Sequence, residues 1–320
     1  MRITILTRSK EYSTDRVIDW LLHECEEFDR VNTDVYTFEK QTIPEPLGES
    51  YCYVRRVSTP NLFGNLGFYL KKEIGHYWKE YLSSKAKDEI LGSRNIFEPY
   101  NIKTIHLAEQ AGLRVPRSII TSCKKTLLEF LDENSSIITK PLVAPLNIIN
   151  EKKDFTFRVA EVKKEDALIV NDRFYPTFFQ EKITRDYEVR LFYIKGECKS
   201  MAFIVNPDNE DSPDIWNVKR RREVPIYTPV SIQVSVGRFM SLAKCNIGSL
   251  DFIICGHNWY FLELNPSGQY DFVSKSCNYY LDRLIAKTLI NDSRQRRNRH
   301  KELERVSSIK VCNEVSDKET

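Results

Sequence analysis

The segment from Gly248 to Pro266 constrains the chain most, because it predicts a β-hairpin with two carboxylates on one face. Two runs rich in Ile, Phe, Leu and Tyr flank a turn at 256–258, where Gly and Asn are typical turn residues. A turn centred there places Asp251 opposite Glu263, and Asn265 shares the face of Glu263 because side chains alternate along a strand. The opposite face can enter a core and carries Leu250, Phe252, Leu262 and Leu264.

This hairpin face predicts a metal site. Two carboxylates that face each other repel, and a divalent cation removes that repulsion. With an amide oxygen they form a hard, all-oxygen ligand set that suits Mg²⁺ held with water and phosphate. The alternative is a hairpin edge whose charges simply face water. The apolar neighbours and the Asn-Pro-Ser-Gly sequence after the strand favour the metal site, with Asp251, Glu263 and Asn265 as ligands.

The composition is that of a folded protein. The chain has 320 residues, of which 41% are hydrophobic and 29% charged, and this length predicts two or three domains. A net charge of +3 does not require a nucleic-acid partner. No apolar run is long enough to span a bilayer, and no signal peptide is recognised. The 8 cysteines form no C-x-x-C pair, which favours free thiols in a reducing cytoplasm.

Strands and helices alternate along the chain, which predicts an α/β (α+β) fold. The opening is βαβ-like, but its first turn lacks G-x-G-x-x-G, and no P-loop follows later. A last helix is expected at about 277–291. The tail from Asp292 is basic and polar, which favours a frayed end. Nucleic-acid binding is less favoured, because no aromatic residues interleave the basic ones.

The order of the motifs resembles the ATP-grasp superfamily and, within it, the graspetide synthetases, the branch that modifies peptides. Lys140 and Gln180-Glu181, each taken alone, are typical of a solvated strand end. Glu188 with Arg190 is more typical of an ordinary half-exposed strand, so the resemblance depends on the set. Two motifs are specific to the branch: aromatic-x-Arg-Arg at 53–56 and Asn-Pro-x-Gly-Gln-aromatic at 265–270. The more general motifs are Gly112-Leu113-x-x-Pro116, Ile138-Thr139-Lys140-Pro141, Phe179 to Ile183 with Glu188-x-Arg190, and Gly248-x-x-Asp251-Phe252.

The resemblance covers residues 1–291 and implies an ATP-grasp fold. Its parts would be an N-terminal βαβ-like pre-ATP-grasp domain (1–98), a central subdomain (99–178), a C-terminal subdomain with the metal site (179–291) and a tail (292–320). ATP and Mg²⁺ are the implied cofactors. The implied enzyme is an ADP-forming ligase, a peptide maturase that activates Glu or Asp side chains of a ribosomal precursor peptide as acyl phosphates. Side-chain ester or amide crosslinks then form.

The resemblance also implies residue roles. The catalytic residues facing the phosphates would be Lys140 and Arg190. The ATP site would add Gln180, Glu181, Lys182, Ile183, Glu188 and Asn265, the first four through backbone groups near adenine. The metal ligands would be Asp251, Glu263 and Asn265. The residues expected to bind an acidic peptide are Arg55, Arg56 and Arg222, the last from its place just before Val224-Pro225.

The implied partner is a precursor peptide with a leader and an acidic core. The likeness is greatest to the peptide maturases of grasp-with-SPASM systems, which adds a radical SPASM-type maturase and a homodimer as expected partners. A cytoplasmic location without membrane or nucleic-acid partners is expected. Two departures leave a catalytically weak homologue open: only Lys103 stands near the superfamily's earlier lysine, and 141–158 has no glycine. The alternatives are an amino-acid ligase of the glutathione synthetase or glutamate ligase type and a non-catalytic nucleotide-binding protein.

Overall fold

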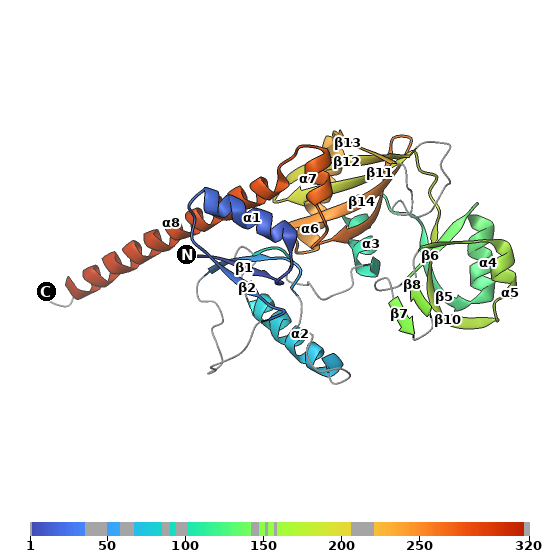
Figure 1. Ribbon diagram of the computed structural model, residues 1–320, viewed down its shortest axis with the longest axis horizontal. Helices are drawn as coiled ribbons and strands as arrows, with labels where there is room; N and C mark the ends of the chain where they lie inside the picture. Colours follow the sequence, from blue (N-terminus) through green and yellow to red (C-terminus); the bar gives the residue numbers. More distant parts are fainter. Residues whose placement is uncertain are drawn as a thin grey trace. The chain divides into compact units, whose positions relative to one another are not determined.

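The computed structural model describes residues 2–35, 50–57, 67–84, 90–93, 101–141, 147–150, 153–156, 159–205 and 221–316. The chain divides into two compact units, one formed by Met1–Phe97 with Tyr280–Thr320 and the other by Glu98–Tyr279 (Figure 1). The four-part division expected from the sequence stays a prediction. Among the helices in these ranges, none has the length and hydropathy that crossing a membrane requires.

The first unit is built on a parallel sheet. Its strands are β1 (Arg2–Thr7), β2 (Phe28–Asn32), β3 (Ser50–Val54) and β4 (Ile90–Leu91), in the order β2-β1-β3-β4. β3 is buried along its whole length, as expected of a parallel strand covered on both faces. Helix α2 (Gly67–Ser84) packs Trp78 and Leu82 against β3 and β4, while α1 (Tyr12–His23) packs against α8 (Leu281–Ser316).

Helix α8 corrects the expectation of a short last helix followed by a frayed tail. It runs without a break from Leu281 to Ser316. Past residue 291 its polar side chains have specific partners: Asp292 accepts a hydrogen bond from the Tyr51 hydroxyl, and Arg294 forms an ion pair with Glu26. Ser293 is fully buried. The helix therefore continues because tertiary contacts replace the apolar pattern that fades there.

The second unit contains two antiparallel sheets. The central sheet has the order β5-β10-β6-β9 and carries α4 (Lys124–Glu133) and α5 (Lys164–Ile169) on one face; its strands are β5 (Ser118–Cys123), β6 (Ile137–Lys140), β9 (Ala160–Val162) and β10 (Arg173–Glu181). A separate two-stranded ribbon pairs β7 (Asn147–Asn150) with β8 (Lys153–Thr156).

The C-terminal sheet has the order β13-β12-β11-β14-β15. Its strands are β11 (Tyr187–Ile194), β12 (Glu197–Val205), β13 (Arg221–Ile226), β14 (Ile247–Cys255) and β15 (Asn258–Asn265). One face holds the largest apolar core of the unit, where α3 (Asn101–Gln110) and α6 (Val230–Leu242) cover the alternate residues of β11 and β14. The short helix α7 (Asp271–Ser276) lies against β13. The other face carries the polar residues Glu188, Arg190, Asp251 and Glu263, and Phe272 of α7 packs on it against Phe203.

The contact between α8 and β3 yields a stability prediction. Asp292→Ala removes the carboxylate that accepts the Tyr51 hydroxyl, and a hydrogen bond to a charged group contributes about 1.5–3 kcal/mol. We expect a loss of that size in the free energy of unfolding, measured by urea denaturation. Asp19→Ala, at an exposed position of α1, is the matched control and should change little. Equal stability of the Asp292→Ala variant and the wild type would restore the frayed-tail interpretation.

Candidate active site

The predicted carboxylate hairpin forms, but its turn is shorter than expected. Only Gly256 and His257 connect β14 to β15, and Gly256 has a φ of +58°, which glycine adopts without strain. This turn pairs Cys255 with Asn258 and would by itself bring Leu262 opposite Asp251. A bulge next to Asp251 takes up one residue, and Asp251 therefore does lie opposite Glu263, as the sequence predicts.

The bulge also changes which side chains enter the core. Phe261 is fully buried in the core beneath the sheet, together with Leu250, Phe252 and Leu264. Leu262 lines a pocket on the other face. The expectation that Leu262 belongs to the core face is therefore wrong, because the extra residue shifts the alternation of β15 by one position.

Arg190 adjoins the carboxylate pair. It lies opposite Asp251 in the register of β11 and β14, and its Nη1 is 3.0 Å from Asp251 Oδ2. The side chains of Arg190 and Asp251 are only 6% and 19% exposed. Burial raises the pKa of Asp251 to about 8; Arg190 lowers it, while Glu263 and Glu188 raise it further. Two carboxylates held this close favour a proton or a cation between them.

Lys140 reaches the same area from the central sheet. Its Nζ lies 5.2 Å from the centre of the Phe178 ring, its neighbour across from β6 on β10. The side chain is half-buried, and burial lowers the pKa of Lys140 while the charge of Glu263 opposes that shift. Lys140 is thus a partly desolvated cation coupled to a carboxylate of the other sheet.

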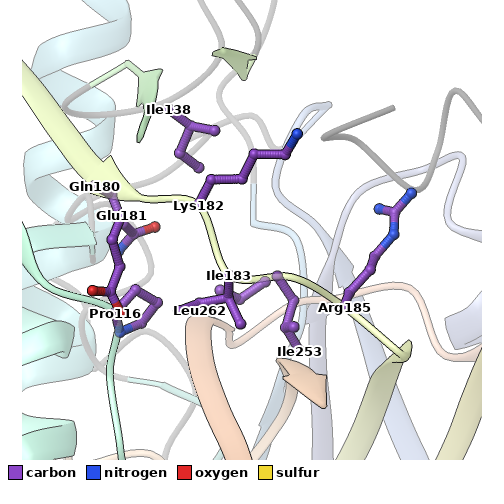
Figure 2. A pocket seen from close by; sticks show the side chains of 9 residues that line it. All are labelled: Pro116, Ile138, Gln180, Glu181, Lys182, Ile183, Arg185, Ile253 and Leu262. Carbon is purple, nitrogen blue, oxygen red and sulfur yellow. The ribbon is translucent and has the colours of Figure 1, made fainter. Parts of the chain in front are cut away.

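A pocket lies near these charges, and Figure 2 shows the residues that line it. Its walls come from both sheets and from the connector between β10 and β11; they are formed by Pro116, Ile138, Gln180, Glu181, Lys182, Ile183, Arg185, Ile253 and Leu262. Ile253 is two residues from Asp251 and shares its face, so the pocket is a neighbour of the carboxylate pair. Apolar walls with a few polar groups are typical of a site for a small molecule or cofactor.

The four residues expected near adenine all line this pocket, but their contacts differ. The Gln180 side chain is buried and donates a hydrogen bond to Ser118 Oγ at 2.9 Å, so it fixes the strand. The N–H groups of Glu181 and Lys182 donate to the carbonyls of Arg117 and Ser136. The Lys182 side chain pairs with Glu161 at 3.0 Å. These contacts hold the connector in one conformation up to Ile183.

The active-site face is the face of the C-terminal sheet that carries Glu188, Arg190, Asp251 and Glu263. Glu188 and Asn265 lie toward its two ends. Glu188 pairs with Arg185 of the pocket at 2.7 Å. Asn265 is exposed and lies opposite Ser249. Gly268 closes the turn after it: a Cβ there would lie 2.8 Å from Ser249 Cβ, so only glycine fits. The Asn-Pro-Ser-Gly turn is thereby held against β14.

The arginines expected to bind substrate belong to different units. Arg55 and Arg56 follow β3 in the first unit, whereas Arg222 belongs to β13 in the second. Arg222 is exposed and lies opposite Ile204, on the face away from Arg190. Its neighbour Arg221 lies on the active-site face, 4.9 Å from the centre of the Phe203 ring. Sequence alternation alone does not show that Arg221, and not Arg222, shares the face of Arg190; the register of β12 and β13 does. Lys219 and Arg220 lie outside the described residues.

The residues present fit a hard divalent cation. Over the described ranges, no three His, Cys, Asp or Glu side chains cluster as a metal site. The candidate centre consists of two carboxylates, with Asn265 beyond them. A set of two or three protein oxygen donors suits Mg²⁺, because Mg²⁺ keeps water and phosphate oxygens in its coordination shell. They do not suit zinc, which favours Cys and His ligands.

Solved structures with a similar fold include ATP-grasp ligases. Macrocyclase MdnC of Microcystis aeruginosa, bound with precursor peptide MdnA, is 20% identical over 91% of this chain and 99% of that one, with a TM-score of 0.74. A RiPP-associated ATP-grasp ligase of Chryseobacterium gregarium, in complex with ADP and a leader and core peptide, is 16% identical over 92% and 97%, with a TM-score of 0.73. ATP-grasp ligase PsnB, complexed with minimal precursor, Mg and ADP, is 17% identical over 91% and 97%, with a TM-score of 0.69.

The chain therefore has the ATP-grasp fold, which confirms the expected fold class. No family model and no curated protein matches the sequence.

The carboxylate pair predicts an unusual pH dependence. The folded pKa of Asp251 is raised from 3.8 to about 8, so the metal-free folded protein holds a proton that the unfolded chain has lost. Its unfolding free energy should therefore fall as pH rises through that window. A shift of one pKa unit corresponds to about 1.4 kcal/mol, so the loss should exceed that value.

Urea denaturation in EDTA at a series of pH values measures this loss. Asp251→Asn should flatten the slope, and Mg²⁺ added to the wild type should offset part of it. Asp19→Asn, on an exposed turn of α1, should keep the wild-type slope. An Asp251→Asn slope equal to that of the wild type would contradict the arrangement of the pair.

Proposed function

We propose that this chain is an ATP-dependent, ADP-forming ligase that crosslinks side chains of a ribosomal precursor peptide. The observation that carries the proposal is the meeting of Lys140, from the central sheet, with Asp251, Glu263 and Arg190, from the C-terminal sheet, beside one apolar pocket. The fold supports it, since macrocyclase MdnC was solved with a precursor peptide, the Chryseobacterium gregarium ligase with ADP and a leader and core peptide, and PsnB with minimal precursor, Mg and ADP.

The pocket provides the adenine site. Ile138, Ile253 and Leu262 form apolar walls for the ring, and the backbone from Glu181 to Ile183 provides polar groups at its edge. Glu188 is oriented by Arg185 and bonds the ribose. Because backbone groups would meet the ring, the Gln180 side chain is not needed there and stays bonded to Ser118.

The charged residues beside the pocket bind the phosphates. Asp251, Glu263 and Asn265 would hold Mg²⁺, which would neutralise charge on the transferring phosphoryl group. Lys140 and Arg190 contribute positive charge from a partly dry location, where electrostatic attraction is stronger than in water. The ion pair with Asp251 restricts the conformation of the Arg190 side chain.

The reaction then needs no enzyme nucleophile. A Glu or Asp carboxylate of the peptide attacks the terminal phosphorus, which forms an acyl phosphate and releases ADP. A hydroxyl or amine of another side chain attacks the acyl carbon, which forms an ester or amide and releases phosphate. Most of the acceleration comes from positioning and charge stabilisation.

The proposed partners follow from this function. The peptide carries a leader and an acidic core, and Arg55, Arg56 and Arg222 are proposed to contact it. A homodimer, a radical SPASM-type maturase of the same system and a cytoplasmic location complete the proposal; they are supported only by the likeness of sequence motifs.

Co-expression with a short peptide encoded beside this protein tests the function. Mass spectrometry should show the peptide lighter by one or more water molecules, because each crosslink removes one. Glu263→Gln should abolish the loss while the protein stays folded, because it removes a metal ligand on a face outside the core. If the wild type hydrolyses ATP but the mass of the peptide does not change, the proposal is contradicted. A peptide that gains the mass of an amino acid would identify an amino-acid ligase instead.

Lys140→Ala should weaken nucleotide binding. A cation that acts on phosphate from a partly buried position contributes at least about 1.4 kcal/mol, so the Kd for ADP should rise about tenfold or more. Isothermal titration calorimetry measures it. Lys125→Ala makes the same charge change on α4, where the side chain is 85% exposed, and should leave the Kd unchanged. Equal affinities of all three proteins would make Lys140 an ordinary strand terminus.

A further inference from the structure

Ser249 has a buried hydroxyl group that makes no hydrogen bond. The residue is 1% exposed, and no described residue offers its Oγ a hydrogen-bond partner. A buried polar group without a partner destabilises a fold, because it has lost its bonds to water and gained none. Such groups are rare in folded proteins, and a role in function is one of the reasons for which they persist.

Ser249 completes the candidate metal centre by its place in the sheet. On β14, Ser249 and Asp251 are two residues apart and share one face. Across the strand pair, Ser249 lies opposite Asn265 and Asp251 lies opposite Glu263. The four residues therefore form two neighbouring pairs on one face. Three of them are the candidate metal ligands, and Ser249 is the fourth.

The hydroxyl is covered, whereas the residue opposite it is not. A Cβ added to Gly268 would lie 2.9 Å from Ser249 Oγ and 3.1 Å from Asn265 Cβ, so the turn after β15 packs on both. Asn265 nevertheless remains exposed. A ligand in front of the sheet therefore meets Asn265 before it meets Ser249.

An amide ligand has to be oriented. The Asn265 side chain ends in an oxygen, which can bind a cation, and in an NH₂ group, which a cation repels. The two ends have nearly the same shape, so packing alone does not choose between them. A hydroxyl that accepts a hydrogen bond from Nδ2 holds Oδ1 toward the cation. Partners that orient metal ligands in this way change metal affinity about 10- to 100-fold.

The strand pairing brings the two groups within reach of each other. Side chains directly opposite in an antiparallel pair have Cβ atoms about 4.5–5.5 Å apart. Ser Oγ lies one bond and Asn Nδ2 two bonds beyond these atoms, so the two can meet at hydrogen-bond length. In the structure the bond is not made, which leaves the hydroxyl unpaired.

We infer that Ser249 is a positioning residue of the metal centre: its Oγ accepts a hydrogen bond from Asn265 Nδ2 and thereby turns Oδ1 toward a divalent cation. The inference rests on the proposed function, which makes Asn265 a metal ligand. It deepens that function by a residue at one of the two open positions of the Gly248-x-x-Asp251 motif.

Opposite effects on stability and on metal binding test this role. Ser249→Ala removes an unpaired hydroxyl, so its urea midpoint in EDTA should be at least that of the wild type. The increase of the midpoint on adding Mg²⁺ should be smaller than in the wild type. In calorimetric titrations, the Kd for ADP in EDTA should not change, and the factor by which Mg²⁺ tightens ADP binding should fall about tenfold.

Ser200→Ala is the matched control. Ser200 is also 1% exposed, on β12 of the same sheet, but its Oγ lies 2.6 Å from Thr228 Oγ1. Removal of this bonded hydroxyl should lower the urea midpoint and leave the effect of Mg²⁺ as in the wild type. The two variants thus separate an unpaired hydroxyl from a structural one.

A double-mutant cycle with Asn265→Asp shows whether Ser249 acts through Asn265. A carboxylate presents oxygen at both ends, so it needs no group to orient it. Ser249→Ala should therefore reduce the effect of Mg²⁺ in the wild-type background and change it little in the Asn265→Asp background. Such non-additivity is expected of residues that act together.

The outcomes separate this inference from the proposed function. A lower urea midpoint of Ser249→Ala in EDTA, an undiminished effect of Mg²⁺, or the same loss in both backgrounds would overturn the inference. So would a wild type whose midpoint does not respond to Mg²⁺. A wild type that responds to Mg²⁺ through Ser249 but does not bind ADP would retain the inference and refute the ligase.

Discussion

The opposition of Asp251 and Glu263 across the β14–β15 hairpin is the constraint on which the candidate active site depends. Two carboxylates that face each other across a strand pair repel, and Arg190 neutralises only part of their charge. The surrounding sheet tolerates the arrangement because its other face is a large apolar core that fixes the strands. An enzyme that must bind a cation and phosphates gains from charges that are held in place, since no reorganisation is then needed when the substrate binds.

One inserted residue connects this charge arrangement to the pocket. The bulge at Leu262 restores the pairing of Asp251 with Glu263 after a turn of only two residues. The same bulge directs Phe261 into the core and Leu262 into the pocket wall. The facing carboxylates and the place of Leu262 in the pocket wall are thus consequences of a single backbone irregularity, and bulges occur often beside active sites.

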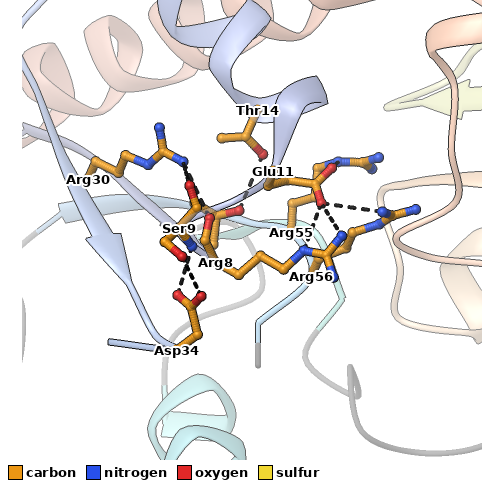
Figure 3. A network of polar contacts seen from close by, with 9 residues as sticks. Arg8, Ser9, Glu11, Thr14, Arg30, Asp34, Arg55 and Arg56 are labelled. Atoms are coloured by element: carbon orange, nitrogen blue, oxygen red, sulfur yellow. Dashed lines mark hydrogen bonds and ion pairs between the residues drawn. The ribbon is translucent and has the colours of Figure 1, made fainter. Parts of the chain in front are cut away.

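Both units hold buried ion pairs beside exposed charged side chains. In the second unit, the carboxylates of Glu188, Asp251 and Glu263 face the cations of Arg185, Arg190 and Lys140. In the first, Arg8, Arg55 and Arg56 all pair with the buried carboxylate of Glu11 (Figure 3). In both units a buried ion pair joins separate parts of the chain, Arg190 with Asp251 and Arg55 with Glu11.

The sequence by itself determined the hairpin, the facing carboxylates, the strand that ends in Lys140 and the order of the motifs. These features depend on local alternation and turn chemistry, which a strand expresses wherever it lies. It placed Leu262 on the wrong face, because a bulge depends on the pairing with the partner strand.

Only the tertiary structure decided three further points. It extended α8 past Asp292 through contacts with Tyr51 and Glu26, joined Lys140 to the charges of another sheet, and brought Arg8 beside Arg55 and Arg56. Each of these contacts joins residues of different elements, and local sequence patterns do not specify which elements become neighbours in the fold.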